Sequence, residues 1–210
     1  MYEHCWLNSL HIFSSGAKAI TGVMLIIVCS MIPSYVIFPS EDLSFSIIPL
    51  QSNWQIQGLF LISLLCGPRI GTISAISYLF IGLFYLPIFH GGGSVGYILT
   101  SEFGYLLGFV PAAWTCGFLS QKNPNANLIN FSFYTAFSLC IIHSIGIIYL
   151  VAGSIFGNWR ENISELILIN TLIPFPTQLL LCISISLVSI ILKRILIIKW
   201  LPSRSEEWKQ

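Results

Sequence analysis

Six apolar runs, each close to the length of a membrane-spanning helix, restrict what this chain of 210 residues can fold into. They cover residues 17–38, 53–67, 70–89, 102–120, 130–153 and 168–198. A helix needs about 20 apolar residues to cross a bilayer. Only 8% of the residues are Asp, Glu, Lys or Arg, whereas a soluble domain carries about 25%. The sequence therefore predicts an all-α integral membrane protein with six transmembrane helices.

The positions of the basic residues predict how these helices are oriented. Six spans place both termini on one side of the membrane. If that side is the cytoplasm, Arg160 is the only Lys or Arg that falls outside, as the excess of basic residues in cytoplasmic loops requires. We therefore expect one multi-pass domain over residues 1–210 in the plasma membrane. It comprises a cytoplasmic segment 1–16, a six-helix bundle 17–198 and a cytoplasmic tail 199–210.

Several function classes are disfavoured by the residues themselves. The net charge of +1 gives no reason to expect a nucleic-acid partner. The six cysteines are far apart and form no C-x-x-C pair, so neither a metal site nor a disulfide framework is expected. No nucleophile–base pair or P-loop is present, so we expect neither an enzyme nor a bound cofactor. Gly91, Gly93 and Gly96 match G-x-G-x-x-G, but a membrane span precedes them where a dinucleotide site needs a strand.

The segments expected outside the membrane are longer than those inside, which favours capture of a ligand, although loop variability alone could produce the same pattern. They are residues 38–52, the glycine loop around residues 91–93, and residues 153–164. Near them, the outer halves of the helices carry neutral polar and aromatic side chains, which suit a small pocket with apolar walls. Polar residues at 51, 53, 55 and 57 alternate, as in an extended segment. The candidate ligand contacts are Gln55, Tyr97, Tyr105, His143, Tyr149, Asn170 and Gln178. Membrane anchoring by the tyrosines and helix–helix contacts by the other polar groups would explain the same residues.

Three fragments, in this order and spacing, resemble a known family. They are CGPRIG (66–71), YLFIGLFYLPIFHGGG (78–93) and FGYLLGFVPAAW (103–114), and they are similar to the BioY biotin-transporter family. Phe103 and PFPTQL (174–179) resemble its cyanobacterial branch in particular. Members of this family are the substrate-binding S components of energy-coupling-factor (ECF) transporters. The resemblance implies the six-helix S-component fold, with a biotin site near the outer face under the loop after the first helix and the glycine loop.

The resemblance also implies partners. These are a transmembrane coupling protein and two cytoplasmic ATPases, or further copies of the chain if it works without them. The small residues of the first helix that would meet the coupling protein are Ala17, Thr21 and Gly22.

The sequence departs from the family pattern at the last helix. Where the family often has an Asp and a Lys that approach the ligand carboxylate, this chain has Gln178 and Leu181. Neutral donors would then hold the carboxylate, from Gln178, from nearby hydroxyls or from the backbone of Gly91, Gly92 and Gly93, because successive backbone N–H groups can bind an anion. Arg160, the only cation expected outside, is the alternative. Glu102 stands where the family usually has Thr, and an acid is favourable at a helix N-terminus.

Three hypotheses follow from the sequence. The first is a biotin-binding uptake component. The second is an S component for another small vitamin or a biotin precursor. The third is a structural membrane subunit without a ligand.

Overall fold

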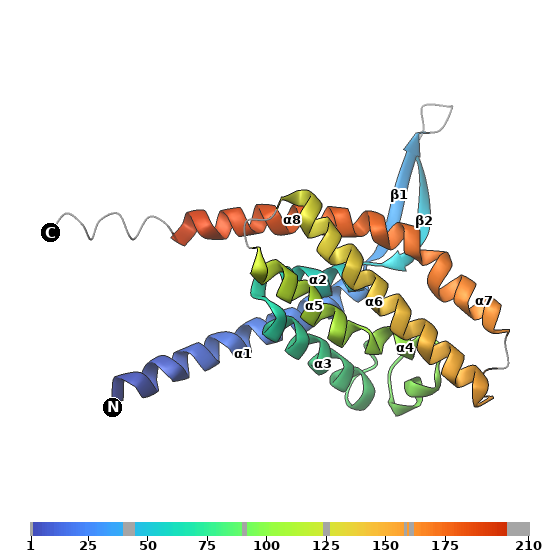
Figure 1. Ribbon diagram of the computed structural model, residues 1–210, viewed down its shortest axis with the longest axis horizontal. Coiled ribbons are helices and arrows are strands. Elements are labelled where there is room, and N and C mark those ends of the chain that lie inside the picture. The colour runs from blue at the N-terminus through green and yellow to red at the C-terminus, as the bar shows by residue number, and fades with distance from the viewer. Residues whose placement is uncertain are drawn as a thin grey trace.

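The computed structural model describes residues 2–39, 45–89, 92–123, 127–157, 159 and 162–200. Helices dominate the fold (Figure 1). They are α1 (Tyr2–Ser30), α2 (Gln55–Cys66), α3 (Pro68–Phe84), α4 (Phe103–Leu107), α5 (Phe109–Lys122), α6 (Leu128–Ile155), α7 (Ile163–Ile167) and α8 (Pro174–Trp200). The strands are β1 (Pro33–Pro39) and β2 (Phe45–Asn53), and two short turns are the 3-10 turn η1 (Val95–Leu99) and the π-helical turn η2 (Leu168–Leu172).

Three helical stretches of the described chain are long and apolar enough to cross a membrane, namely Phe103–Lys122, Leu128–Ile155 and Ile163–Ile195. Three shorter apolar helices accompany them, at Ser15–Ser30, Gln55–Cys66 and Pro68–Phe84. The predicted helical membrane protein is therefore confirmed at the level of fold class. Within the last stretch, the N–H of Ile173 bonds to the carbonyl of Leu168 at 3.0 Å. This π-helical turn accommodates Pro174, which has no N–H of its own.

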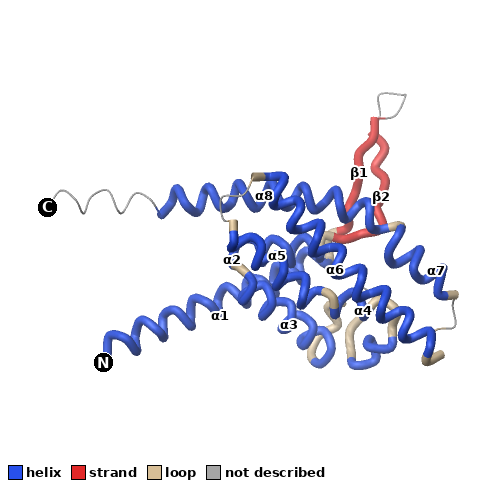
Figure 2. Tube along the Cα trace, viewed as in Figure 1, coloured by secondary structure: helices blue, strands red, loops and turns tan. Residues whose placement is uncertain are grey.

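The segment after α1 corrects the sequence prediction. The first helix ends at Ser30, not at residue 38, and a two-stranded antiparallel hairpin follows, with Pro33 opposite Asn53 and Phe38 opposite Ser46. The all-α assignment is therefore wrong for this hairpin. The run YVIF (35–38) is β-branched and aromatic and favours a strand, while Pro33 cannot donate the bond that would continue a helix. Figure 2 shows the hairpin projecting from the helices.

Two further boundaries differ from the sequence prediction. Residues 51 and 53 are extended in β2, as the alternation predicted, but residues 55 and 57 already belong to helix α2. The third predicted span, 70–89, ends at Phe84. The chain then forms the loop that contains Pro87, which again cannot donate a helical bond.

Helix α2 lies at the centre of the bundle. It packs against α1, α3, α5 and α8, and all its residues from Gln55 to Leu64 are buried except Leu61. A helix enclosed by protein on all sides is apolar all round. The buried polar residues of α2 are Gln55, Gln57 and Ser63, and each needs a partner inside the protein. The Ser63 hydroxyl has one within the helix, since it donates to the Leu59 carbonyl at 2.8 Å.

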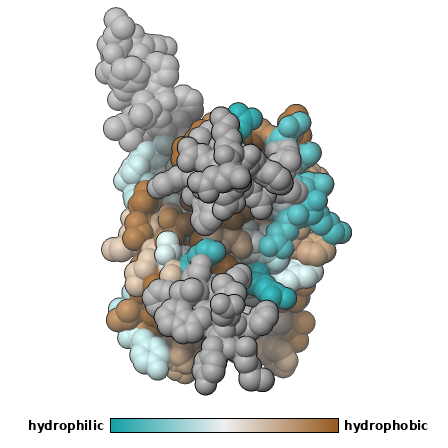
Figure 3. Space-filling model, turned by 90° about the vertical axis from the view of Figure 1, so that its left-hand side faces the viewer, coloured by the Kyte–Doolittle hydropathy of each residue, from teal (hydrophilic) through white to brown (hydrophobic). Residues whose placement is uncertain are grey.

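The start of α1 and the end of α8 lie on the same side of the bundle, away from the hairpin (Figure 1). Viewed from this end, the described surface shows both apolar and hydrophilic residues, and the hydrophilic ones are most numerous toward one edge (Figure 3). In α8 near this end, the Lys193 ammonium donates to Ser120 Oγ at 2.8 Å and lies 4.4 Å from the ring centre of Phe131. Ser120 in turn donates to the Leu64 carbonyl at 3.1 Å. These bonds join α8, α5 and α2.

Candidate ligand-binding site

The glycine loop is held close to the end of α3 by its own packing. A Cβ atom on Gly93 would lie 2.6 Å from Pro87 Cα and 2.7 Å from the Gly82 carbonyl oxygen, so no side chain fits there. Gly92 has a φ of +137°, which L residues avoid, and a Cβ there would meet no atom within 4 Å. Gly91 lies outside the described residues. Packing therefore explains the glycine at 93, and contact of this loop with a ligand stays a prediction.

Gln55 bonds within the fold. Its amide nitrogen donates to the Tyr78 hydroxyl at 3.0 Å, and that hydroxyl donates to the Ile88 carbonyl at 3.2 Å. All three groups lie in or beside the buried core. The chain of bonds joins the start of α2, through α3, to the loop before the glycines. Gln55 thus has a structural role, and any contact with ligand would be an addition to it.

Tyr97 packs beside the same loop that contains Ile88 and Phe89. Its ring packs on Phe89 with ring centres 4.9 Å apart, and its hydroxyl donates to Glu102 Oε2 at 2.6 Å. Burial raises the pKa of the Tyr97 phenol, and the neighbouring Glu102 carboxylate raises it further. The phenol therefore stays protonated near neutral pH and can donate to Glu102. Glu102 precedes α4 but makes no side-chain cap bond, so the bond with Tyr97 is its observed role.

A second polar cluster lies between α6 and α8. His143 is 5% exposed, and its Nε2 lies 2.8 Å from Gln178 Oε1. Because an amide oxygen can only accept, Nε2 carries the proton and Nδ1 is left as an acceptor. Among the described residues, Nδ1 is buried and has no hydrogen-bond partner. The pair therefore presents one unused acceptor inside the bundle.

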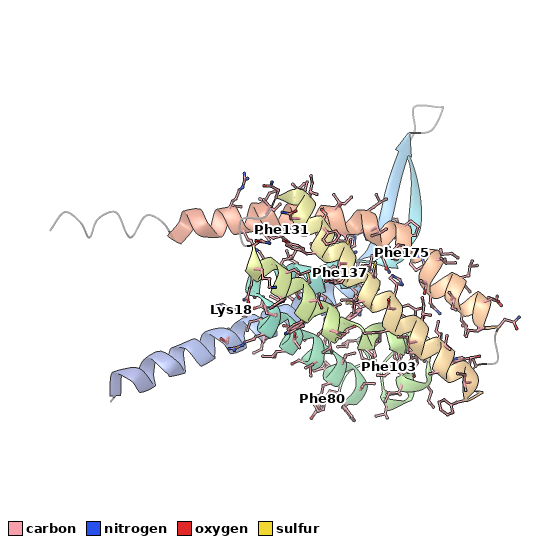
Figure 4. The ribbon with its side chains drawn as sticks, in the orientation of Figure 1. Lys18, Phe80, Phe103, Phe131, Phe137 and Phe175 are labelled. Carbon is pink, nitrogen blue, oxygen red and sulfur yellow. The ribbon has the colours of Figure 1, made fainter. Side chains whose placement is uncertain are left out.

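Aromatic rings enclose this histidine on two sides. The ring centre of Tyr105 lies 5.7 Å from that of His143, and Phe175 lies 5.1 Å away, both edge to face. Phe175 is on α8, close to where the helix meets α6 (Figure 4). The Tyr105 hydroxyl shares a 2.6 Å hydrogen bond with Thr171 in η2. The half-buried Asn170 is its neighbour in that turn.

Tyr149 lies in a third aromatic group near the C-terminal end of α6. Its ring centre is 6.0 Å from Phe103 and 6.1 Å from Trp159, and its hydroxyl donates to the Ile98 carbonyl. The structure thus brings Tyr105, His143 and Gln178 together. It places Gln55 and Tyr97 in the cluster beside the glycine loop, and Tyr149 with other rings.

Gln57 was not among the residues that the sequence singled out as ligand contacts. Its side chain is 0% exposed, and neither its amide nitrogen nor its amide oxygen has a partner among the described residues. Position 57 belonged to the polar alternation at the start of α2, but only the structure separates Gln55, which is paired, from Gln57, which is not.

The partner face predicted on α1 needs one correction. Ala17 and Thr21 are exposed, and the Thr21 hydroxyl donates to the Ala17 carbonyl at 2.9 Å. Gly22, in contrast, is buried, and a side chain there would collide with Ser74 and Ile62. Gly22 therefore lets α1 approach α2 and α3 within the chain, so it does not belong to an outward face.

The described residues contain no group of three His, Cys, Asp or Glu side chains that could hold a metal ion. The His143–Gln178 pair and the nearby Tyr105 and Thr171 hydroxyls include no carboxylate or ammonium group. Together with the apolar rings beside them, they can recognise a small ligand that offers both donors and acceptors.

Comparison with known proteins gives an independent view of the chain. A family model described as "BioY family" matches residues 8–197. A probable biotin transporter BioY of Lysinibacillus sphaericus is 34% identical over 116 residues, which are 55% of this chain and 59% of that protein. The biotin transporter BioY of Thermotoga maritima is 27% identical over 130 residues, covering 60% of this chain and 70% of that one.

One solved structure has the same fold. It is the crystal structure of the S-component for biotin from an ECF-type ABC transporter, with a TM-score of 0.66. The two chains are 19% identical, and the match covers 88% of this chain and 92% of the other.

Proposed function

Because this chain belongs to the BioY family, we propose that it binds biotin and serves as the substrate-specific component of an ECF-type transporter. The observation on the site that carries this proposal is the buried His143–Gln178 pair, which leaves the His143 Nδ1 acceptor unused. Biotin offers ring N–H donors, a ring carbonyl, an apolar sulfur ring and a carboxylate. Neutral polar groups beside Tyr105 and Phe175 suit such a ligand.

We further propose that the chain forms a single membrane domain, spans the plasma membrane six times and has both termini in the cytoplasm. The three long and three shorter apolar helices support this number. Helix α2 has only 12 residues and would extend about 18 Å, less than the roughly 30 Å of a hydrocarbon core. Its burial within protein makes this tolerable, since its ends need not meet lipid.

The carboxylate of biotin would meet neutral donors in this chain. Gln178 is half-buried and faces His143 through its oxygen, which leaves its amide nitrogen available to a ligand. Leu181, where the family often has a cation, is 9% exposed and offers no donor. A hydrogen bond to a charged group contributes about 1.5–3 kcal/mol, so Gln178 can replace part of what the missing lysine would supply.

Transport would require partners. The proposed ones are a transmembrane coupling protein and two cytoplasmic ATPases, or other copies of this chain if it acts alone. Ala17 and Thr21 are exposed on α1 and have small side chains, which let another helix approach closely. The chain itself would act as a binding subunit and not as an enzyme.

Uptake of labelled biotin tests this function. Cells that cannot import biotin would express the chain alone or together with a coupling protein and ATPases. We expect accumulation of label that excess unlabelled biotin abolishes. If neither set of cells accumulates biotin although the chain reaches the membrane, uptake as the function is wrong. Preferential uptake of dethiobiotin, a precursor with the same urea ring and no sulfur, would favour the second hypothesis.

A further inference from the structure

Two glutamines two residues apart in α2 have opposite environments. Gln55 is 6% exposed and donates to Tyr78. Gln57 is 0% exposed, and among the described residues both its amide nitrogen and its amide oxygen lack a partner. Removing an amide from water without replacing its hydrogen bonds costs free energy. A leucine or methionine at position 57 would fill the same space without this cost. Packing alone therefore does not explain the amide, whereas a hydrogen-bonding partner from outside the chain would.

Gln57 and Gln55 lie on different faces of α2, because residues two apart in a helix are separated by about 200° around its axis. Gln57 therefore does not face Tyr78 of α3, to which Gln55 donates. Helix α2 also packs on α8, and strand β2, which ends two residues before α2 begins, packs on α8 as well. Helix α2 therefore packs on the helix that carries Gln178.

The chemistry of the two unpaired atoms specifies the group that would satisfy them. A primary amide places one acceptor and one pair of donors side by side. A cyclic urea places an N–H beside its C=O, so the two can form a pair of parallel hydrogen bonds. Neither partner is charged, so burying the complex requires no counter-ion.

We propose that Gln57 recognises the urea ring of biotin, with its amide oxygen accepting from a ring N–H and its amide nitrogen donating to the ring carbonyl. This inference rests on the proposed function, because it takes biotin as the ligand. It assigns the selectivity for the urea to α2 and leaves the opposite end of the ligand to Gln178.

Gln57→Met is the variant that tests this assignment, because methionine has nearly the length and flexibility of glutamine without its amide. We expect biotin affinity to fall roughly tenfold to a hundredfold, as the loss of two hydrogen bonds predicts. The stability of the ligand-free protein should stay equal or increase, because an unpaired buried amide is removed. The matched control is Gln55→Met, which breaks the bond to Tyr78 and should lower stability.

A second ligand makes the test specific for the urea. The diamine that remains after removal of the urea carbonyl from biotin keeps the sulfur ring and the carboxylate. The wild-type protein should prefer biotin to this diamine, and Gln57→Met should lose most of that preference.

The outcomes separate this inference from the proposed function. If the folded wild-type protein does not bind biotin, the proposed function fails first. If it binds biotin and Gln57→Met binds equally well, Gln57 is not in the site. The inference is also overturned if the variant loses stability as Gln55→Met does, or if it weakens biotin and the diamine by the same factor. An ordered water that satisfies Gln57 without ligand would produce one of these results.

Discussion

Replacing Gln178 by leucine tests the pair between α6 and α8. The change removes the 2.8 Å bond to His143 Nε2 and leaves the imidazole, which is 5% exposed, with neither nitrogen paired among the described residues. Leaving a buried polar group unsatisfied costs about 1–3 kcal/mol. We therefore expect the free energy of unfolding to fall by about that amount. Biotin affinity should fall by about tenfold or more, since a factor of ten corresponds to roughly 1.4 kcal/mol.

The double variant His143→Phe/Gln178→Leu separates stability from binding. Replacing both partners of a hydrogen bond by apolar groups of similar shape can be nearly neutral for stability. The double variant should therefore regain most of the stability lost in Gln178→Leu while its biotin affinity stays low. Thermal unfolding in detergent and equilibrium biotin binding, measured on the same preparations, give both quantities. If the double variant recovered biotin affinity together with stability, the His143–Gln178 pair would serve only to hold α6 and α8 together. That result would refute the proposal that the pair belongs to the biotin site.

Two further variants test the packing of α1 and the loop that contains Tyr97. Gly22→Leu should destabilise the protein by about 1–3 kcal/mol, because its side chain would overlap Ser74. The control is Gly16→Leu, which should change the unfolding temperature little, because a Cβ at position 16 meets no atom within 4 Å. Equal effects of the two variants on the unfolding temperature would show that α1 is not packed as described. Tyr97→Phe removes the bond to Glu102. Since the pKa of Tyr97 is raised by folding, its contribution to stability is complete below about pH 10 and is lost at higher pH. The variant should therefore lose less stability than the wild type on titration above pH 10, and parallel curves would contradict the observed environment of Tyr97.

The sequence predicted a helical membrane protein because the length of an apolar run can be read from consecutive residues, without knowledge of tertiary contacts. The end of α1 was misplaced because residues 31–38 are as apolar as the helix before them, and apolarity does not distinguish a strand from a helix. Pro33 was the local signal for the change. The π-helical turn Leu168–Leu172 lies just before Pro174, which cannot donate a helical bond.

The arrangement of polar groups depended on tertiary contacts that the sequence does not state. His143 and Gln178 are 35 residues apart, and both were predicted as ligand contacts, but their mutual bond appears only in the structure. Gly22 and Ala17 looked equivalent as small residues of one helix, whereas one is buried and the other is exposed. The difference between Gln55 and Gln57 likewise depends on Tyr78, which is more than 20 residues away along the chain.

Equilibrium binding of labelled biotin to the purified protein in detergent or in lipid nanodiscs tests the central claim most directly. We expect saturable binding at nanomolar biotin that excess unlabelled biotin competes away. A protein that is monodisperse and helical, but shows no saturable binding at micromolar biotin, would contradict the assignment of biotin as its ligand.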